Sequence, residues 1–171
     1  MNVPSEILPF LWLGAAAGRT DDMLKEKGVT LVINATNGCP MSKKCCVRQV
    51  KLKCEDAPGY NLKKHFEDVS GLIQEEKKNG GKVFVHCIGG ISRSSSLVLA
   101  YLVRYENMTL LDAHTLVKSK RLFIRPNAGF WEQLVQYEKE ILGSNTVTMM
   151  RYGGKPVASV YQEEYSNMLV L

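Results

Sequence analysis

The sequence predicts a single α/β domain with a central mixed sheet of about five strands flanked by helices. Short apolar runs alternate with helical patterns along the chain, an order typical of a sheet covered by helices. An apolar strand at residues 83–87 lies in the middle of this alternation. The chain of 171 residues is 45% hydrophobic and long enough for one sizeable core. We therefore expect one domain over residues 1–142 and a C-terminal extension over residues 143–171 that packs on it.

The first elements follow from local patterns. Residues 10–13 form an apolar run that predicts the first strand. Thr20 is placed to cap a short helix that ends at Gly28. Residues 31–33 are wholly apolar and predict a strand buried on both faces. Residues 47–54 alternate apolar with charged side chains, which predicts a strand with one exposed face.

The later elements surround the strand at residues 83–87, which passes through two glycines into a helix that is apolar over residues 97–103. Before this strand, apolar residues recur at helical spacing from 62 to 73, and the glycines of residues 79–81 end that helix. After it, residues 109–112 resemble a capping box that opens another helix. The last helix is marked by an apolar stripe at Phe130, Leu134, Tyr137 and Ile141.

The C-terminal extension carries a turn at residues 152–154 and an apolar end at residues 168–171. Two interpretations stay open: the extension docks on the domain as a strap, or its apolar end forms a patch for self-association. We accordingly expect a monomer or a weak dimer.

Composition excludes several classes of protein. The net charge of +5 favours acidic or phosphorylated partners, but no nucleic-acid motif accompanies the basic residues, so no nucleic-acid partner is expected. The five cysteines lack metal-ligand spacing, so we expect no disulfide framework, no metal and no cofactor. No apolar run reaches membrane-spanning length, and residues 7–13 lack the preceding basic residue of a signal peptide. Because no disulfide framework is expected, we expect a reducing compartment, namely the cytoplasm and also the nucleus.

A cysteine, Cys87, stands where the central strand gives way to a helix. The start of a helix offers unpaired N–H groups and the positive end of the helix dipole, which together bind anions. These groups, with Arg93 six residues later, should lower the pKa of the thiol. Gly89 and Gly90 let the backbone approach a ligand closely, and the guanidinium of Arg93 matches two phosphate oxygens. The loop therefore predicts a site where sulfur attacks a phosphate monoester.

His86, Cys87, five further residues, Arg93 and Ser94 together resemble the HCxxGxSRS phosphate loop of the dual-specificity phosphatases, within the cysteine-dependent protein tyrosine phosphatase superfamily. The resemblance covers roughly residues 5–142, and it implies a protein tyrosine phosphatase-like fold and a catalytic domain there. It also implies a metal-independent enzyme that hydrolyses phosphotyrosine and phosphoserine or phosphothreonine in proteins through a cysteinyl-phosphate intermediate. The implied phosphate-binding residues are Ile88, Gly89, Gly90, Ile91, Ser92 and Arg93.

The resemblance also suggests roles outside the loop. Asp56 is the candidate general acid and later base, with the neighbouring Glu55 as its competitor. Ser94 would donate a hydrogen bond to the departing sulfur, or would simply cap the helix. His86 would buttress the loop and tune the thiol. Asn127 matches the asparagine that braces the phosphate loop in the family, and it is also a natural cap for the last helix.

Two other functions stay open. A phosphoprotein-binding scaffold would need the loop but not Asp56. A phosphatase for a non-protein phosphate such as a phosphoinositide usually carries lysine in the loop, whereas residues 88–91 carry no charge here. Cys54, two residues before Asp56, is the nearest candidate for a redox partner of Cys87, although an inert core cysteine is the simpler interpretation.

Overall fold

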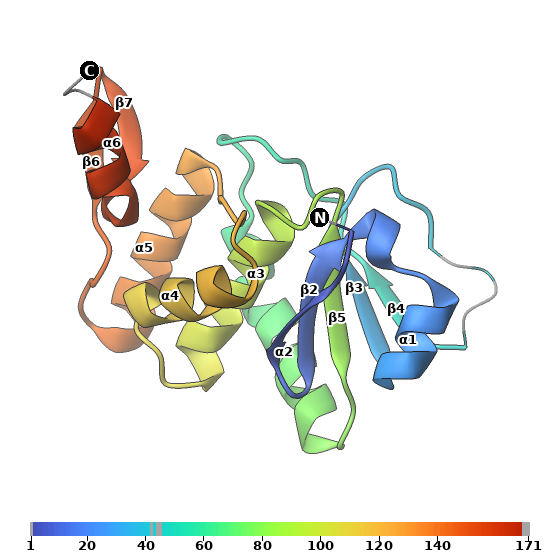
Figure 1. The fold of residues 1–171 in the computed structure, drawn as a ribbon. Helices are drawn as coiled ribbons and strands as arrows, with labels where there is room; N and C mark the ends of the chain where they lie inside the picture. Colours follow the sequence, from blue (N-terminus) through green and yellow to red (C-terminus); the bar gives the residue numbers. More distant parts are fainter. Residues whose placement is uncertain (1, 42, 44–45, 169–171) are drawn as a thin grey trace.

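The computed structural model describes residues 2–41, 43 and 46–168, and a five-stranded mixed sheet lies between helices in this part of the chain (Figure 1). The strand order is β1-β2-β5-β3-β4. Strands β2, β5, β3 and β4 run parallel, and β1 runs antiparallel to β2. The bounds are β1 Ser5–Leu8, β2 Leu11–Ala15, β3 Leu31–Asn34, β4 Arg48–Lys51 and β5 Val83–Cys87. The predicted fold class is therefore confirmed.

Each face of the sheet has its own core. Helix α1 (Asp21–Lys27) covers one face, and the residues of this smaller core are Trp12, Met23, Leu24, Val29, Val32 and Phe84. Helices α2 (Phe66–Lys78) and α3 (Arg93–Tyr105) cover the other face and share the main core with it. Because side chains alternate along a strand, Phe84 belongs to the smaller core and its neighbour Val85 to the main one.

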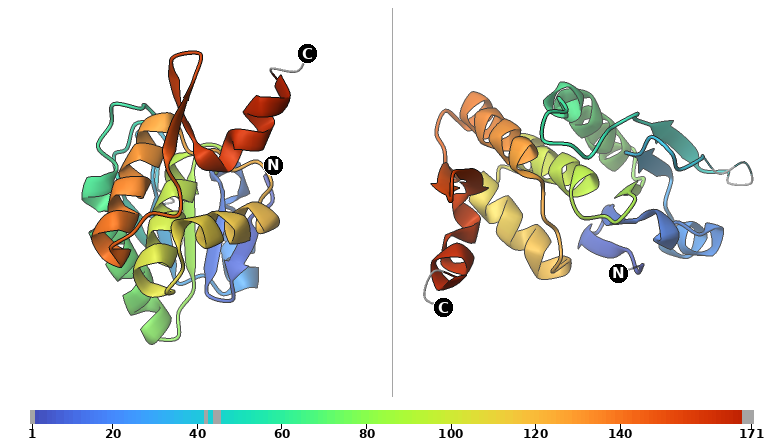
Figure 2. Two further views of the ribbon diagram at one scale, coloured as in Figure 1. Left: turned by 90° about the vertical axis from the view of Figure 1, so that its left-hand side faces the viewer. Right: turned by 90° about the horizontal axis from the view of Figure 1, so that it is seen from above.

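Helix α3 lies at the centre of the helical layer. Its residues 94–103 are all buried, and α2, α4 (Leu110–Lys120) and α5 (Ala128–Leu142) pack around it (Figure 2). The start of α3 is therefore held by neighbours on several sides, directly after the loop that contains the predicted site.

The helix caps predicted from the sequence are confirmed. The hydroxyl of Thr20 accepts from the backbone N–H of Met23 at 3.1 Å, and Gly28 ends α1 with φ +69°. The hydroxyl of Thr109 accepts from the N–H of Asp112 at 3.2 Å. Over the described residues, no helix combines the length and apolar character needed to cross a bilayer.

Three predicted element boundaries are wrong. The single first strand over residues 10–13 is instead a hairpin of β1 and β2, since the chain turns at Pro9, whose ring nitrogen cannot donate to a ladder. The strand over residues 47–54 ends at Lys51, because its neighbour β3 ends opposite at Asn34. The regular helix expected from residue 62 begins at Phe66, after a short 3-10 helix.

The C-terminal extension contains more structure than the expected turn. Its elements are β6 (Met149–Tyr152), β7 (Lys155–Ala158), the 3-10 helix η3 (Ser159–Tyr161) and α6 (Gln162–Met168). The hairpin turns at Gly153 and Gly154, which both have positive φ, and its strands pack on α5 (Figure 2). The apolar end predicted at residues 168–171 lies outside the described residues after Met168.

A buried carboxylate joins the extension to the helices. Glu138 on α5 accepts from the backbone N–H of Leu110 and of Thr146, each at 2.7 Å. The first of these groups starts α4 and the second belongs to the extension. Further along, the guanidinium of Arg125 forms two hydrogen bonds of 3.1 Å with the carboxylate of Glu164 on α6.

We expect stability to fall on mild acidification. Burial lowers the pKa of both His86 and His114 from 6.5 to about 4, with a further contribution at His114 from the Lys118 charge. Below pH 6.5 these histidines are protonated in the unfolded chain but stay neutral in the folded chain, so the free energy of unfolding decreases toward pH 4. Between pH 7 and pH 5 this amounts to about 2 kcal/mol per histidine.

Urea unfolding at pH 7 and pH 5 measures this effect. His114 packs edge-on to the rings of Trp131 and Tyr161, so phenylalanine can replace it. The His114→Phe variant should lose about 2 kcal/mol less than the parent over this pH interval. An identical pH dependence in both proteins would show that His114 does not titrate as described.

Candidate active site

Cys87 ends β5, and residues 88–92 curl around its side chain before α3 begins at Arg93. The sulfur is buried and lies 3.1 Å from Oγ of Ser94. The backbone N–H groups of Gly90, Ile91 and Ser94 also form hydrogen bonds with it. The thiol therefore faces the start of a helix, as the sequence predicts.

These hydrogen bonds set the ionisation of the thiol. Burial by itself raises the pKa of Cys87, but the hydroxyl of Ser94 and the three backbone amides outweigh this effect and lower the pKa. Donors of this kind stabilise the thiolate rather than the thiol. The predicted direction is confirmed, and the main cause is the ring of donors rather than the charge of Arg93.

The amides converge on the sulfur because the carbonyls of the loop are held from outside. Each carbonyl from residue 88 to residue 92 accepts a hydrogen bond from a group beyond the loop. The donors, in order, are the N–H of Ala16, Nη2 and Nε of Arg121, the N–H of Arg125 and the N–H of Ser96. Carbonyls turned outward leave the amides turned inward, which makes the loop a nest for an anion.

Arg121 is a supporting residue that the sequence analysis missed. Its buried guanidinium donates to the carbonyls of Gly90 at 2.9 Å and Gly89 at 3.0 Å, and also to that of Val3 at 3.1 Å. Gly90 has φ +65°, and a Cβ there would lie 2.5 Å from the backbone of Gly14. Sequence alone shows Arg121 only as a basic residue after a helix, a position where surface residues are common.

Arg93 is held from the opposite side of the loop. Its Nη1 donates to the backbone carbonyl of Cys54 at 3.0 Å, so the guanidinium is attached to the segment that precedes Asp56. Its Nε is buried and has no hydrogen-bond partner among the described residues. A buried donor without an acceptor is costly, and a phosphate oxygen would supply the acceptor.

His86 supports the loop as a neutral ring. Its Nε2 lies 3.3 Å from Nη1 of Arg19, and its Nδ1 lies 3.2 Å from the carbonyl of Cys87. Arginine only donates, so Nε2 accepts and the ring proton is on Nδ1, directed at that carbonyl. Burial lowers the pKa of His86 to about 4, which keeps the ring neutral. Arg19 is not predictable as a site residue from the sequence, because 67 positions separate it from His86 along the chain.

Asn127 links the candidate acid to the phosphate loop. Its Nδ2 donates to Oδ1 of Asp56 at 2.9 Å, and its backbone N–H donates to Oγ of Ser92 at 3.0 Å. Its Oδ1 accepts from the N–H of Phe130 at 2.9 Å and so caps α5. The predicted cap is confirmed, whereas the contact with the phosphate loop is made by the backbone N–H, so a brace of the loop by the Asn127 side chain stays a prediction. Within the described chain, Asp56 makes this contact and Glu55 does not.

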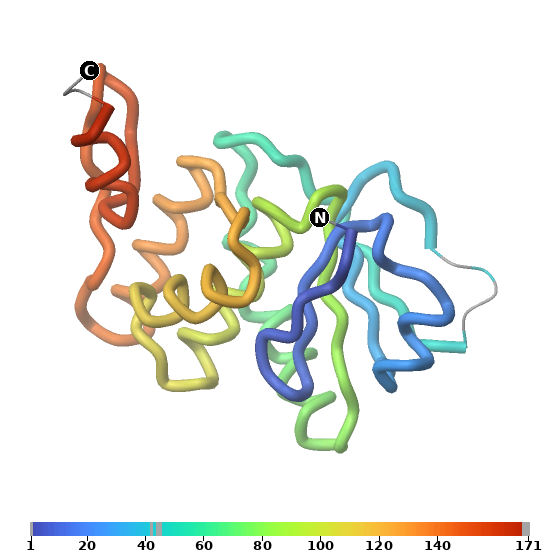
Figure 3. Tube along the Cα trace, in the orientation of Figure 1, coloured from blue at the N-terminus to red at the C-terminus, as the bar shows by residue number. Residues whose placement is uncertain are grey.

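The loop that carries Asp56 lies on the start of α5, at the same edge of the sheet as residues 88–92 (Figure 3). A Cβ on Gly129 would lie 1.9 Å from the carbonyl oxygen of Pro58, so only glycine permits this close approach. Gln133 adds a hydrogen bond of 2.8 Å from Nε2 to the carbonyl of Tyr60. Both contacts join segments about 70 residues apart, so the sequence gives no local sign of them.

Cys54 contributes its backbone rather than its thiol. The side chain is buried, and burial raises its pKa, an effect that a hydrogen bond with Tyr60 partly offsets. A redox role for Cys54 stays a prediction. Among the described residues, no three His, Cys, Asp or Glu side chains gather in a way that could hold a metal ion.

Alkylation by iodoacetamide tests the ring of donors, because only the thiolate reacts. The rate at Cys87 should reach its plateau at a lower pH than that of an ordinary thiol. In the Ser94→Ala variant, which lacks one donor, the titration should move to higher pH. Ser119→Ala, far along α4, is the matched control and should leave it unchanged. Equal titrations for Ser94→Ala and the parent would remove the Ser94 hydroxyl as a cause.

A family model, curated proteins and solved structures that resemble this chain all point to the same family. The family model described as dual specificity phosphatase, catalytic domain, matches residues 11–140. Dual specificity protein phosphatase 14 of Mus musculus is 35% identical over 166 residues, which are 96% of this chain and 84% of that protein. Dual specificity protein phosphatase 18 of Pongo abelii is 36% identical over 168 residues, covering 98% of this chain and 89% of that protein. The crystal structure of human DUSP28 superposes with a TM-score of 0.78 at 33% identity, covering 82% of this chain and 95% of that one.

Proposed function

The chain belongs to the dual specificity phosphatase family, and from this premise we propose the role of each residue in its reaction. The protein is a cysteine-dependent phosphatase of phosphorylated proteins, with dual specificity for phosphotyrosine and phosphoserine or phosphothreonine. The observation that supports the individual roles best is the ring of inward amides and the Ser94 hydroxyl around the sulfur of Cys87.

In the first step, the thiolate of Cys87 attacks phosphorus and the bond from phosphorus to the leaving oxygen breaks. Arg93 and the amides of residues 88–92 bind the non-bridging oxygens, whose charge they stabilise. The carboxyl group of Asp56 gives its proton to the leaving tyrosine, serine or threonine oxygen. The products of this step are the free hydroxyl and a phosphocysteine.

In the second step, water attacks the phosphocysteine and the sulfur–phosphorus bond breaks. The Asp56 carboxylate now takes the proton from this water, which restores the acid for the next cycle. The Ser94 hydroxyl, 3.1 Å from the sulfur, donates to the thiolate as it leaves. Inorganic phosphate is released. His86, which is neutral, supports the loop and moves no proton.

The proton donor can be tested with an isosteric variant. Asp56→Asn keeps an oxygen that accepts from Asn127, so the loop should stay in place while proton donation is lost. We expect kcat to fall about 100-fold with a phosphopeptide and KM to change little. Glu55→Gln is the matched control and should keep the parent's kcat. A large loss in Glu55→Gln with none in Asp56→Asn would reverse the assignment.

The two alternative functions have less support. A scaffold that only binds phosphoproteins gains nothing from a carboxylate held by Asn127 at the edge of the loop. A phosphoinositide phosphatase would benefit from extra cations for the additional phosphates, and Ile88 instead exposes an apolar side chain there. Hydrolysis of a phosphopeptide in the presence of a chelator, compared with a soluble phosphoinositide, distinguishes these functions.

We also propose a reducing environment, in the cytoplasm or the nucleus, because oxidation of a thiolate such as Cys87 would stop catalysis. For the same enzyme we propose a monomer or a weak dimer. Fractionation of cells and sedimentation of the purified protein test these two proposals.

A further inference from the structure

A pocket of about 220 Å³ opens between the residues that precede α5 and the C-terminal extension. Residues 125–128 and Trp131 form one wall. Residues 156–158, Tyr161 and Tyr165 form the other wall. The extension therefore completes a cavity that the phosphatase domain alone would leave as an open surface.

This pocket shares two lining residues, Arg125 and Asn127, with the supports of the phosphate site. Asn127 lines the pocket and also contacts Asp56 and Ser92. Arg125 lines it too, and its backbone N–H donates to the carbonyl of Ile91 at 2.8 Å. The pocket therefore adjoins the contact of Asn127 with Asp56 at the edge of the phosphate site, so the residues that flank a phosphorylated side chain in the loop are the candidates to occupy it.

The chemistry of the pocket favours an apolar occupant. Its walls are mainly aromatic, proline, valine and alanine side chains. The charge of Arg125 is compensated by the two hydrogen bonds with Glu164, and its guanidinium lies 4.1 Å from the centre of the Tyr161 ring. The polar atoms of Asn127 are engaged with Asp56 and with the start of α5. A cavity of this size and lining fits one aromatic or branched aliphatic side chain.

We propose that this pocket binds an apolar side chain that flanks the phosphorylated residue of the protein substrate. The inference rests on the proposed function, since it assumes a polypeptide substrate in the phosphate loop. It gives the C-terminal extension a part in substrate selection.

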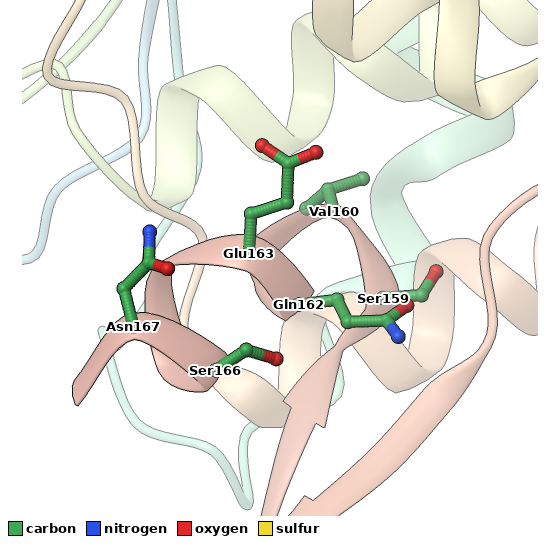
Figure 4. A pocket seen from close by; sticks show the side chains of 6 residues that line it. All are labelled: Ser159, Val160, Gln162, Glu163, Ser166 and Asn167. Atoms are coloured by element: carbon green, nitrogen blue, oxygen red, sulfur yellow. The ribbon is translucent and has the colours of Figure 1, made fainter. Parts of the chain in front are cut away.

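A second hollow on the extension does not share these properties. It is lined by Ser159, Val160, Gln162, Glu163, Ser166 and Asn167, all from η3 and α6 (Figure 4). Its side chains are mostly polar, and none of them belongs to the phosphate loop or to residues 125–128. We therefore assign the substrate contact to the pocket beside Asn127.

Phosphotyrosine peptides test the proposal. In a background of glycine and serine, each position within four residues of the phosphotyrosine carries phenylalanine, leucine, glutamate or glycine in turn. At one position, phenylalanine or leucine should raise kcat/KM about tenfold over glycine. A phenyl phosphate without a peptide measures the reaction itself. If phenyl phosphate is hydrolysed but no position shows more than a twofold preference, or glutamate is preferred, the pocket has no such role. If phenyl phosphate is not hydrolysed, the proposed function fails and the inference fails with it.

Variants then locate the preference. Ala128→Leu fills the pocket and Tyr165→Ala removes an aromatic ring from one of its two walls, so each should reduce the phenylalanine-to-glycine ratio to less than about threefold. Tyr152→Ala is the matched control: Tyr152 contacts the ring of Tyr165 but does not line the pocket, so the tenfold ratio should persist. Because each ratio is measured on one enzyme preparation, a loss of folded protein cancels. A tenfold ratio that survives both Ala128→Leu and Tyr165→Ala would overturn the proposal.

Discussion

Replacing Cys87 by serine should lower kcat/KM for phenyl phosphate by about 10⁴-fold or more. A serine hydroxyl ionises far less readily than a thiol, so it stays protonated in a ring of donors that stabilises a thiolate. Neither neighbouring group removes its proton, because His86 is directed at the Cys87 carbonyl and Asp56 must keep its own proton for the leaving oxygen in this step. Initial rates with the purified variant measure the loss.

The inward amides and Arg93 remain in Cys87→Ser, so the variant should still bind a phosphopeptide, as equilibrium titration would show. Cys46→Ser, which alters an exposed cysteine, should keep the parent's rate. Turnover in Cys87→Ser within tenfold of the parent would show that another group attacks phosphorus.

Replacing Arg93 by lysine should lower kcat/KM about 10³-fold. Arginine holds the Cys54 carbonyl with Nη1 and keeps a buried, unpaired Nε for the ligand, so one side chain performs two directed contacts. A lysine ammonium is a point charge that cannot make both. We expect kcat to decrease and KM to increase, because the guanidinium of Arg93 binds the phosphate both in the bound substrate and during the transfer.

Arg104→Lys is the control for this change. Arg104 forms an exposed ion pair with Glu67 on the helical layer, so the substitution should change the rate less than twofold. If Arg93→Lys also stayed within threefold of the parent, phosphate would not be bound as described.

Local chemistry made much of the fold predictable. The central strand, the helix after it, and the caps at Thr20, Thr109 and Asn127 each depend on neighbouring residues, and each is present. The hairpin at Pro9 was missed because a continuous apolar run conceals the turn. Strand β4 ends at Lys51 because its partner β3 ends opposite at Asn34. The residues of β4 alone therefore do not predict where the strand ends.

The site also contains residues that local sequence predicts and residues that only the folded chain brings together. Cys87, Ser94 and Arg93 lie within one strand–loop–helix unit, so their spacing alone indicates an anion site. Arg121 and Arg19 reach the loop from remote segments, and their sequence neighbours give no sign of it. The link from Asp56 through Asn127 to Ser92 joins three separate loops, and only the resemblance to a family placed these three residues at one site.

Isolation of the covalent intermediate tests the role of Cys87 most directly. The parent enzyme, mixed with a radiolabelled phosphopeptide and quenched within milliseconds, should carry label on the proteolytic peptide that contains Cys87. The label should be absent from the same peptide of Cys87→Ser. Label on another residue, or turnover in the parent with no labelled cysteine at any quench time, would contradict the mechanism.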